Sequence, residues 1–536
     1  MKRIGSDPGG KARGGRRGML AVTAALSALA AGAASAALPP VPVPAENPIT
    51  EPKRVLGKIL FWDEQMSSDN TVACGTCHRP GKGGGDPRSG LYPGKDGVFG
   101  TDDDTFGSPG VPHMDRRGMA AKNALFGMKP QVGDRTAPSY FGNIWAASLF
   151  WDGRAGPKVI DPVSGGTVIA SGGALENQAM GPLQNAAEMA KEDRGWADVS
   201  VKLQHARPLA LATRIPADMK QAVEAHPRYG DLFRAAFGDP QITAVRVAMA
   251  IATYERTLAP DQTPYDLGTR PGAPIDPQVQ QGLVWLESAR CTVCHKPPLF
   301  TDNLFHNIGI RRPFEDQGRA KVTGVKAQGG EMKTPTLRNA ALRTSFMHTG
   351  QYHTLDEVLD EYARTKVDAE PLPGTNEPYA LPLDITVRQQ IKTFLTTGLV
   401  DPRVARETFP FDRPVLRSER AEGLKAPTRP QGFTARFTAP GVVTLDWKPA
   451  PGASDYLLIR DGRVIGLPTA PGFVDDGGLG RWQWHSYRLV ARNDAADASA
   501  AVHAGVGVPA LPLAVAGAAA AGLGMWRLRR RKAKAA

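Results

Sequence analysis

Two pentapeptides of the form Cys-x-x-Cys-His constrain this chain more than any other feature. They span residues 74–78 (CGTCH) and 291–295 (CTVCH), and together they contain all four cysteines of the sequence. This spacing is typical of c-type haem attachment, in which two thiols bind the haem vinyl groups covalently. The histidine that follows supplies the proximal ligand of the iron. A zinc knuckle or a CxxC redox pair is the alternative, but neither requires a histidine after the second cysteine in both copies.

The net charge of +12 is concentrated at the two ends of the 536-residue chain. Six Lys or Arg residues lie within residues 1–36 and six more within residues 527–536, so the sequence between the ends is almost neutral. No basic stretch remains that could follow a phosphate backbone, and a nucleic-acid partner is therefore not expected.

Both ends of the chain carry targeting patterns. Residues 1–36 have the basic region, apolar stretch and small-residue cleavage site of a secretory signal peptide, with an uncleaved anchor as the alternative. Residues 508–532 begin with an uncharged stretch long enough to cross a membrane as a helix and end in a basic cluster. The sequence predicts an exported protein of the periplasm or cell exterior, with its C-terminal segment either anchored in the membrane or removed as a sorting signal.

Between these ends the pattern predicts a mainly α fold with two c-type cytochrome-like haem domains, at residues 37–265 and 266–410. An all-β sandwich is expected at 427–503, followed by the hydrophobic C-terminal helix. Helical periodicity is found at residues 193–204, 215–237, 277–290 and 385–397. Thr243 is an expected N-cap, and Thr354 with Glu357 forms an expected capping box.

Two further regions are distinguished by their composition. Residues 79–135 are rich in Gly, Pro and Asp and are expected to form a long irregular loop. The carboxylates of residues 96–104 are interpreted as either a solvated acidic turn or a calcium-binding loop. After residue 427 the pattern changes to period two, with strands expected at 442–447, 456–460 and 487–491 and a hairpin turn at Asp461-Gly462.

Residues from about Lys53 to Thr397 resemble the bacterial di-haem cytochrome c peroxidase family, including its MauG-like branch. The resemblance rests on LGKILFWD, CGTCH, FWDGRA, ENQAMGPLQNAAEM, YERTL, CTVCH, FHNIGI and KTPTLRN, which occur in the family's order. The β region resembles a fibronectin type III module. The family resemblance implies two covalently bound haem c groups, a peroxide-reducing N-terminal centre and an electron-accepting C-terminal centre.

The resemblance also implies the reaction and its partners. We expect a peroxidase that reduces hydrogen peroxide with electrons from a cytochrome c, a cupredoxin or an oxidisable protein side chain. Two alternatives are a non-enzymatic di-haem electron-transfer protein and a haem-dependent oxygenase of an organic substrate.

Site residues are carried over from the family's motifs. His78 and His295 correspond to the proximal iron ligands. The first haem would be attached through Cys74 and Cys77, and the second through Cys291 and Cys294. Trp151 corresponds to a tryptophan between the haems, with a core aromatic as the alternative. Gln178, Pro182 and Glu188 correspond to the distal side of the peroxide centre. A glutamate in a closed pocket suits proton transfer to peroxide, and an exposed helix carboxylate is the alternative.

Three further ligand assignments follow from the resemblance. The sixth ligand of the second haem corresponds to Tyr362, as in the MauG-like branch, with Met347 as the nearby alternative. One calcium ion is expected between the domains, with Thr136, Arg343 and Ser345 at the matching positions. His113, or else Met128, is a loop residue that can close the first haem, and a surface histidine is the alternative.

Overall fold

The computed structural model describes residues 37–507, apart from residues 365, 367–368, 372–380, 382, 421–426, 454, 467, 481–482, 493–498 and 500. The predicted signal peptide and the predicted C-terminal hydrophobic helix lie outside the described residues. Within the described part, no helix is both long enough and apolar enough to cross a membrane.

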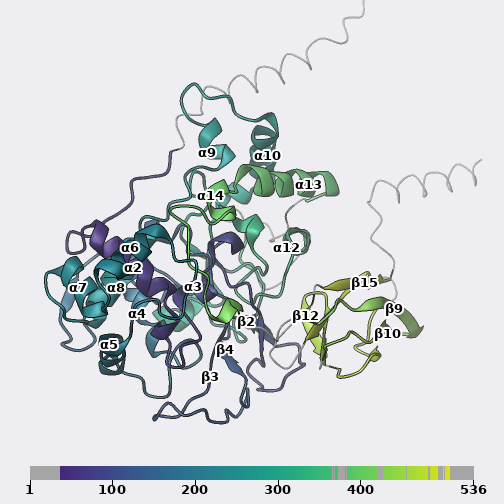
Figure 1. Cartoon of the computed structure of the whole chain (residues 1–536). Coiled ribbons are helices and arrows are strands. Elements are labelled where there is room, and N and C mark those ends of the chain that lie inside the picture. Colours follow the sequence, from purple (N-terminus) through teal and green to yellow (C-terminus); the bar gives the residue numbers. More distant parts are fainter. Residues whose placement is uncertain are drawn as a thin grey trace, which may run out of the picture.

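The first haem-binding region is a cluster of helices around one apolar core (Figure 1). Helix α2 packs along α8, and Thr243 caps α8 as expected by accepting from the amide of Arg246. The helix expected at 215–237 is divided in two at Pro227, because proline cannot donate the next helical hydrogen bond. The helices are α2 (Glu51–Trp62), α3 (Cys74–Cys77), α4 (Ala174–Met180), α5 (Trp196–His205), α6 (Ala217–Ala225), α7 (Tyr229–Phe237) and α8 (Ala244–Glu255).

The second helical region has its own smaller core, above the first in Figure 1. Its last long helix continues as a π-helical turn over Phe394–Gly398. The predicted capping box is confirmed: the Thr354 hydroxyl accepts from the amide of Glu357, and the Glu357 carboxylate accepts from the amide of Thr354. The helices are α9 (Pro264–Gly268), α10 (Pro277–Ser288), α11 (Ala320–Thr323), α12 (Leu355–Tyr362), α13 (Ile385–Thr393) and α14 (Pro402–Ala405).

The long segment 79–135 contains more regular structure than its composition predicts. It folds into two short antiparallel pairs, β1 (Gly90–Tyr92) with β2 (Thr105–Gly107), and β3 (Pro109–Pro112) with β4 (Pro130–Val132). Two further short pairs lie elsewhere in the haem-binding regions: β5 (Val159–Ile160) with β6 (Thr167–Ile169), and β7 (Phe305–His306) with β8 (Met332–Lys333).

The backbone follows the same path in two segments, one after each pentapeptide. Gly142 and Asn339 have φ values of 83° and 60°, and each precedes a single 3₁₀ turn. Phe150 and Met347 have φ values of 68° and 62°, an uncommon conformation for side chains of this size. The following bridges also correspond: Leu149 with Ala155, and Phe346 with Tyr352. The two haem-binding regions are therefore structural repeats, and Trp151 and His348 hold equivalent positions.

Residues after 427 form the expected β-sandwich, and its core contains Trp447, Tyr456 and Tyr487. The turn at Asp461-Gly462 has positive φ at both residues, as a type I′ hairpin requires. One sheet has the order β13-β10-β9 and the other β12-β11-β14-β15, which is the strand arrangement of a fibronectin type III-like module. The strands are β9 (Gln431–Ala439), β10 (Val442–Lys448), β11 (Asp455–Arg460), β12 (Arg463–Gly466), β13 (Phe473–Asp475), β14 (His485–Arg492) and β15 (Val502–Val506).

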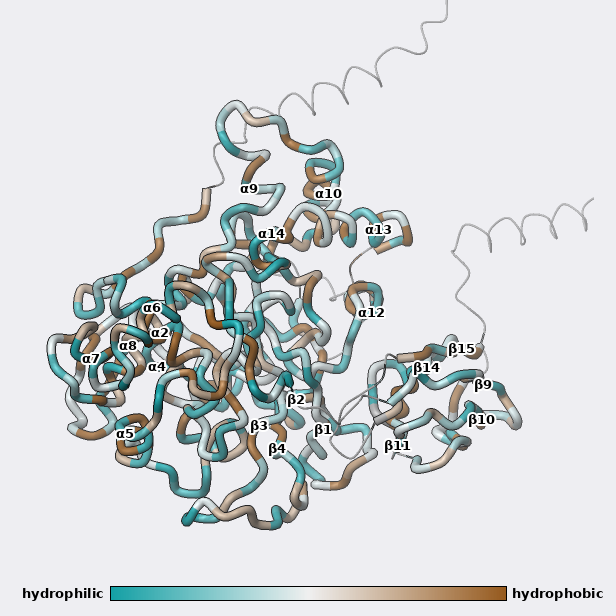
Figure 2. The backbone as a smooth tube through the Cα atoms, in the orientation of Figure 1, coloured by the Kyte–Doolittle hydropathy of each residue, from teal (hydrophilic) through white to brown (hydrophobic). Residues whose placement is uncertain are grey.

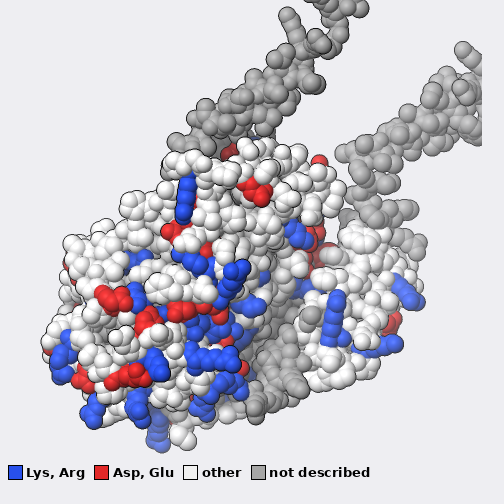
Figure 3. Space-filling view, turned by 45° about the horizontal axis from the view of Figure 1, so that its top comes forward, with Lys and Arg blue, Asp and Glu red and all other residues white. Residues whose placement is uncertain are grey.

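Figure 2 shows apolar residues along both helical regions and along the strands of the sandwich. Charged side chains gather over the lower left of the face shown in Figure 3, and the upper part of that face is mostly uncharged. In Figure 3, Lys and Arg side chains lie beside Asp and Glu side chains on the face shown.

Candidate active site

The first pentapeptide forms the short helix α3, and its histidine is held by the loop that follows. His78 Nδ1 lies 3.2 Å from the carbonyl oxygen of Gly84. A carbonyl can only accept, so Nδ1 carries the proton and Nε2 is left as the ligand atom. Burial lowers the pKa of His78, which favours the neutral imidazole that metal binding needs. A side chain on Gly75 would begin 2.2 Å from the Trp62 ring, so the helix requires glycine there.

The second pentapeptide repeats this arrangement. His295 is buried, and its Nδ1 lies 3.2 Å from the carbonyl oxygen of Phe300. Burial again lowers the pKa of the imidazole. Among the described residues, neither pentapeptide brings its own two sulfurs and its histidine within 4.8 Å of one another. A zinc site needs such convergence, so the geometry favours haem attachment over the zinc knuckle.

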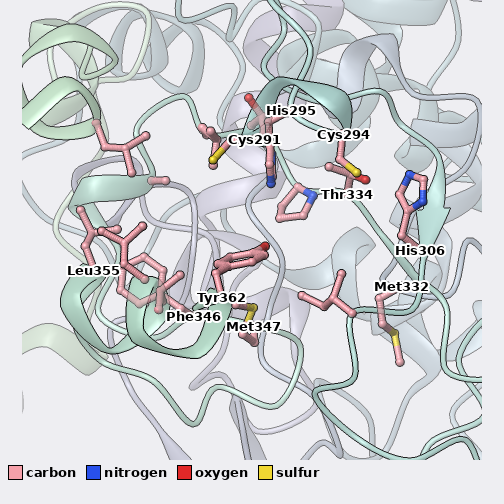
Figure 4. Close-up of a pocket in the computed structure, with 18 of the residues that line it drawn as sticks. Cys291, Cys294, His295, His306, Met332, Thr334, Phe346, Met347, Leu355 and Tyr362 are labelled. Carbon is pink, nitrogen blue, oxygen red and sulfur yellow. The ribbon is translucent and has the colours of Figure 1, made fainter. Parts of the chain in front are cut away.

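A cavity of about 160 Å³ lies beside the second pentapeptide, and its lining is mostly apolar. Figure 4 shows His295 and Tyr362 on opposite sides of the cavity, with Met347 beside the tyrosine ring and the two cysteines at the edge. Burial raises the pKa of Tyr362 above its ordinary value. These residues fit a haem with His295 on its proximal side, and both predicted distal donors reach the same cavity.

Trp151 lies between the two regions. It forms part of the cavity wall, and its indole Nε1 donates to the carbonyl oxygen of Thr136 at 2.8 Å. Its ring meets that of His348 edge to face at a centroid distance of 6.2 Å. The amide of Lys333 donates to the carbonyl oxygen of Trp151, which links the tryptophan directly to the second region. The side chain is therefore fixed at the junction and 8% exposed.

Glu188 follows the 3₁₀ turn Pro182–Gln184 and is half-buried. Burial is the main cause of the raised pKa of the Cys74 and Cys77 thiols, and the negative charge of Glu188 adds to it. Burial raises the pKa of Glu188 itself, and the charge of Arg154 opposes that effect. Asn185 Nδ2 donates to Glu188 Oε1 at 2.6 Å. The Glu188 side chain is thus oriented by Asn185 and is half-buried.

The other predicted distal residues precede Glu188 in the chain. Gln178 lies in the last part of α4 and is half-buried, and Pro182 opens the 3₁₀ turn that follows. Phe150 packs near this turn, and the guanidinium carbon of Arg154 lies 3.6 Å from the centre of its ring.

The two predicted loop donors differ in placement. Strand β3 runs along the Glu188 turn: the amide of Val111 donates to the carbonyl oxygen of Glu188 at 3.1 Å. His113 follows directly after β3 and is half-buried. Met128 is 58% exposed. The structure therefore favours His113 over Met128 as a residue near the first centre.

The residues predicted to bind calcium do not fit that ion. The Thr136 and Ser345 hydroxyls lie 3.3 Å apart and hydrogen-bond each other. Arg343 donates to the carbonyl oxygens of Ser345 and Ala137, each at 3.0 Å. Calcium needs six to eight oxygen ligands, and here a guanidinium occupies the carbonyls that would supply them. The positive charge of Arg343 would also repel a divalent ion.

Arg343 and His348 are candidate functional residues that the sequence patterns did not single out for redox roles. Arg343 lines the second cavity and also lies against the loop that binds His78: a Cβ on Gly85 would lie 2.6 Å from its Nη1. Its Nη1 is buried and has no hydrogen-bond partner among the residues that the structure describes. Alignment of LFWDG, residues 149–153, with FMHTG, residues 346–350, is the signal that would have identified His348 as the counterpart of Trp151.

A third candidate beyond the sequence-predicted set is a pair beside Cys294. His306 Nε2 lies 2.8 Å from an oxygen of Asp302, and this pairing, together with the Cys294 sulfur, raises the pKa of His306 to about 10. Of this pair, His306 lies at the edge of the second cavity (Figure 4).

Comparisons with known proteins agree with this geometry. Residues 51–270 match the model of the family described as di-haem cytochrome c peroxidase. The methylamine utilization protein MauG of Methylorubrum extorquens is 29% identical over 369 residues, covering 68% of this chain and 82% of that protein. The cytochrome c551 peroxidase of Pseudomonas aeruginosa is 27% identical over 323 residues, covering 58% and 72%.

Among solved structures, a MauG-like protein associated with microbial copper homeostasis shares 23% identity, with a TM-score of 0.48. The match covers 70% of this chain and 96% of that chain. Residues 51–270 therefore match the di-haem cytochrome c peroxidase family, and the chain is similar to MauG and cytochrome c551 peroxidase.

Proposed function

We propose that this protein is an exported di-haem peroxidase that reduces hydrogen peroxide at the His78 centre. Electrons enter at the His295 centre from a small redox protein, such as a cytochrome c or a cupredoxin, or from an oxidisable side chain of a protein substrate. The observation that carries the proposal is the position of Trp151 at the junction of two regions whose histidines are each held through Nδ1 by a backbone carbonyl.

Each bound haem supplies an iron that exchanges single electrons. The overall reaction breaks the O–O bond of peroxide, consumes two electrons and two protons, and releases two water molecules. In the proposal, Glu188 takes the proton from the near oxygen and returns it to the leaving oxygen. The raised pKa of this carboxyl group supports such a role, because a base works best when its pKa is close to the working pH.

The chain also provides the electron path. Trp151 lines the second cavity and is joined to the first region through Thr136. An aromatic ring at this place shortens the electron jump between the centres. Tyr362, across the cavity from His295, would supply a hard phenolate ligand to a bound haem, and such a ligand would favour the oxidised iron and a low potential at the second centre.

Stopped-flow mixing of the haem-loaded protein with hydrogen peroxide tests the proposal. We expect the Soret absorption to change rapidly and a reduced donor protein to be oxidised in proportion to the peroxide consumed. Trp151→Phe is expected to slow donor oxidation roughly tenfold, which corresponds to about 1.4 kcal/mol on the barrier. The matched control is Trp145→Phe, because the Trp145 indole also donates to a backbone carbonyl, that of Pro39, but at the surface.

Three results would contradict the proposal. The absence of any spectral change, in both the ferric and the half-reduced protein, would favour a simple electron carrier. Turnover that requires oxygen and ignores peroxide would favour an oxygenase. Equal slowing by Trp151→Phe and Trp145→Phe would remove the proposed electron path.

A further inference from the structure

The outer face of one sheet of the sandwich is apolar and buried. Along β11, Tyr456 and Leu458 point into the sandwich core, whereas Leu457 and Ile459 point to the opposite face. In a free-standing sandwich the outer face is solvated and polar. Here Leu457 and Ile459 are only 4% and 2% exposed, so the sandwich is docked through this face.

The β1–β2 hairpin of the first haem-binding region covers this face. Leu91 and Phe106 form one buried cluster with Leu457, Ile459 and Val490 of the sandwich. On its other side, the hairpin contacts the loop before α12, because the amide of Phe106 donates to the carbonyl oxygen of Thr349 at 2.7 Å. The hairpin therefore lies between the sandwich and the segment that leads into α12.

A buried arginine of the sandwich reaches the N-terminus of α12 directly. Arg488 of β14 is 4% exposed, and its Nη1 lies 3.4 Å from Glu357 Oε1. The other oxygen of Glu357 accepts from the amides of His353 and Thr354, at 2.6 and 3.0 Å. Arg488 thus pairs with the carboxylate that caps the helix.

The sandwich also contacts the chain on both sides of α12 through its Asp461-Gly462 turn. Arg364, just after the helix, donates to the carbonyl oxygen of Asp461 at 3.5 Å. A side chain on Gly462 would begin 3.1 Å from the hydroxyl of Tyr352, which precedes the helix. Tyr362 is the last residue of α12, between these contacts.

We propose that the sandwich positions the distal ligand of the second haem, with Arg488 as the principal positioning residue. Helix α12 has eight residues, and a helix this short is not stable without tertiary contacts. Its terminal residue would fray most readily, and that residue is Tyr362. Contacts from Arg488 and the Asp461-Gly462 turn hold Tyr362 toward His295, in preference to Met347. This inference rests on the proposed role of Tyr362 as the ligand.

The experiment compares four variants of the full haem-loaded protein. Arg488→Met removes the charge and keeps the length, Arg488→Lys keeps the charge, and Arg436→Met removes an exposed arginine elsewhere on the sandwich. Tyr362→Phe removes the phenolate. The measurements are hydrogen–deuterium exchange of residues 354–364, the EPR spectrum of the second haem and its midpoint potential.

We expect Arg488→Met to raise exchange in α12 at least tenfold. We also expect it to reduce the tyrosinate signature at the second haem and raise its potential as Met347 competes. Arg488→Lys should restore much of the wild-type exchange, tyrosinate signature and potential. Arg436→Met should resemble wild type in all three. If Arg488→Met cannot be purified, Leu457→Thr weakens the same docking face without changing charge, and the same changes are expected.

Two outcomes would overturn the inference in distinguishable ways. Wild-type exchange and spectra in both Arg488→Met and Leu457→Thr, with a changed spectrum in Tyr362→Phe, would reject the positioning role alone. An unchanged spectrum in Tyr362→Phe would reject Tyr362 as the ligand and, with it, the role of the sandwich. The peroxidase test with Trp151→Phe is independent of both results.

Discussion

At the scale of single residues, the two centres differ in what faces them rather than in how their histidines are held. His78 and His295 each place Nδ1 at 3.2 Å from a backbone carbonyl. In the proposed function Glu188 serves the first centre, whereas Tyr362 and Met347 line the cavity that contains His295. A proton-transfer group at one centre and iron-ligand donors at the other are suited to different steps of one reaction.

Glu188→Gln is expected to lower peroxide turnover by roughly 10²- to 10⁴-fold, the usual contribution of general acid–base catalysis. In the wild type, activity should fall as the pH drops through the raised pKa of Glu188, because the protonated carboxyl group cannot act as a base. This acidic limb should disappear from the residual activity of the variant. The control is Glu192→Gln, an exposed glutamate four residues later, and equal loss in both variants would contradict the assignment.

Arg343→Met is expected to lower the free energy of unfolding by about 2–3 kcal/mol, because it removes two charged hydrogen bonds to buried carbonyls. Treatment of the wild type with EGTA should leave its thermal midpoint unchanged. Denaturant unfolding and elemental analysis check both expectations, with the exposed Arg117→Met as the control. One tightly bound calcium per chain would show that the guanidinium has not replaced the ion.

At the scale of elements, the first haem-binding region depends on a close helix pair. A Cβ on Gly57 of α2 would lie 1.8 Å from the carbonyl oxygen of Ala250 in α8. The two backbones therefore touch without an intervening side chain. This contact fixes α2, whose last turn supplies the Trp62 ring that packs against Gly75 of the first pentapeptide.

Gly57→Ala is expected to destabilise the protein by about 1–3 kcal/mol, because the helices must separate to admit the methyl group. Helix propensity alone predicts the opposite sign, a gain of about 1 kcal/mol. Gly156→Ala is the control, since nothing lies within 4 Å of the Cβ position there. Urea unfolding monitored by circular dichroism decides between the two signs.

At the scale of the whole molecule, the segment that ends the haem-binding part of the chain, residues 404–416, packs into the core of the first region. Val404, Phe411 and Leu416 lie in the core of the first region. Lys58 of α2 is completely buried and pairs with Asp218 at 3.1 Å and with Asp412 at 2.8 Å. Residues 404–416 therefore connect the second region to the core of the first before the chain enters the sandwich.

Lys58→Met is expected to reduce the free energy of unfolding by about 3–5 kcal/mol, because two carboxylates lose their buried partner. Lys220→Met is the matched control: Lys220 pairs with Glu224 at 3.8 Å on the exposed surface of α6. Its loss should cost less than about 0.5 kcal/mol. Similar effects of the two substitutions on the denaturation midpoint would contradict the structural role of Lys58.

The sequence by itself determined the chemistry and the local elements. The spacing within each pentapeptide predicted haem attachment, and the caps at Thr243 and Thr354 predicted where α8 and α12 begin. Period-two alternation predicted the sandwich strands. These features depend on residues close together in the chain, where spacing alone decides which side chains and backbone groups meet.

Only the tertiary structure decided how distant residues combine. It placed the Arg343 guanidinium on the carbonyl oxygens of Ser345 and Ala137, and it repeated one backbone path so that Trp151 and His348 correspond. It also docked the sandwich, which the sequence presented as a separate module, against the hairpin and helix beside Tyr362. The Arg343–Ala137 and Arg488–Glu357 contacts join residues 206 and 131 positions apart, and local periodicity carries no information about which of these residues become neighbours.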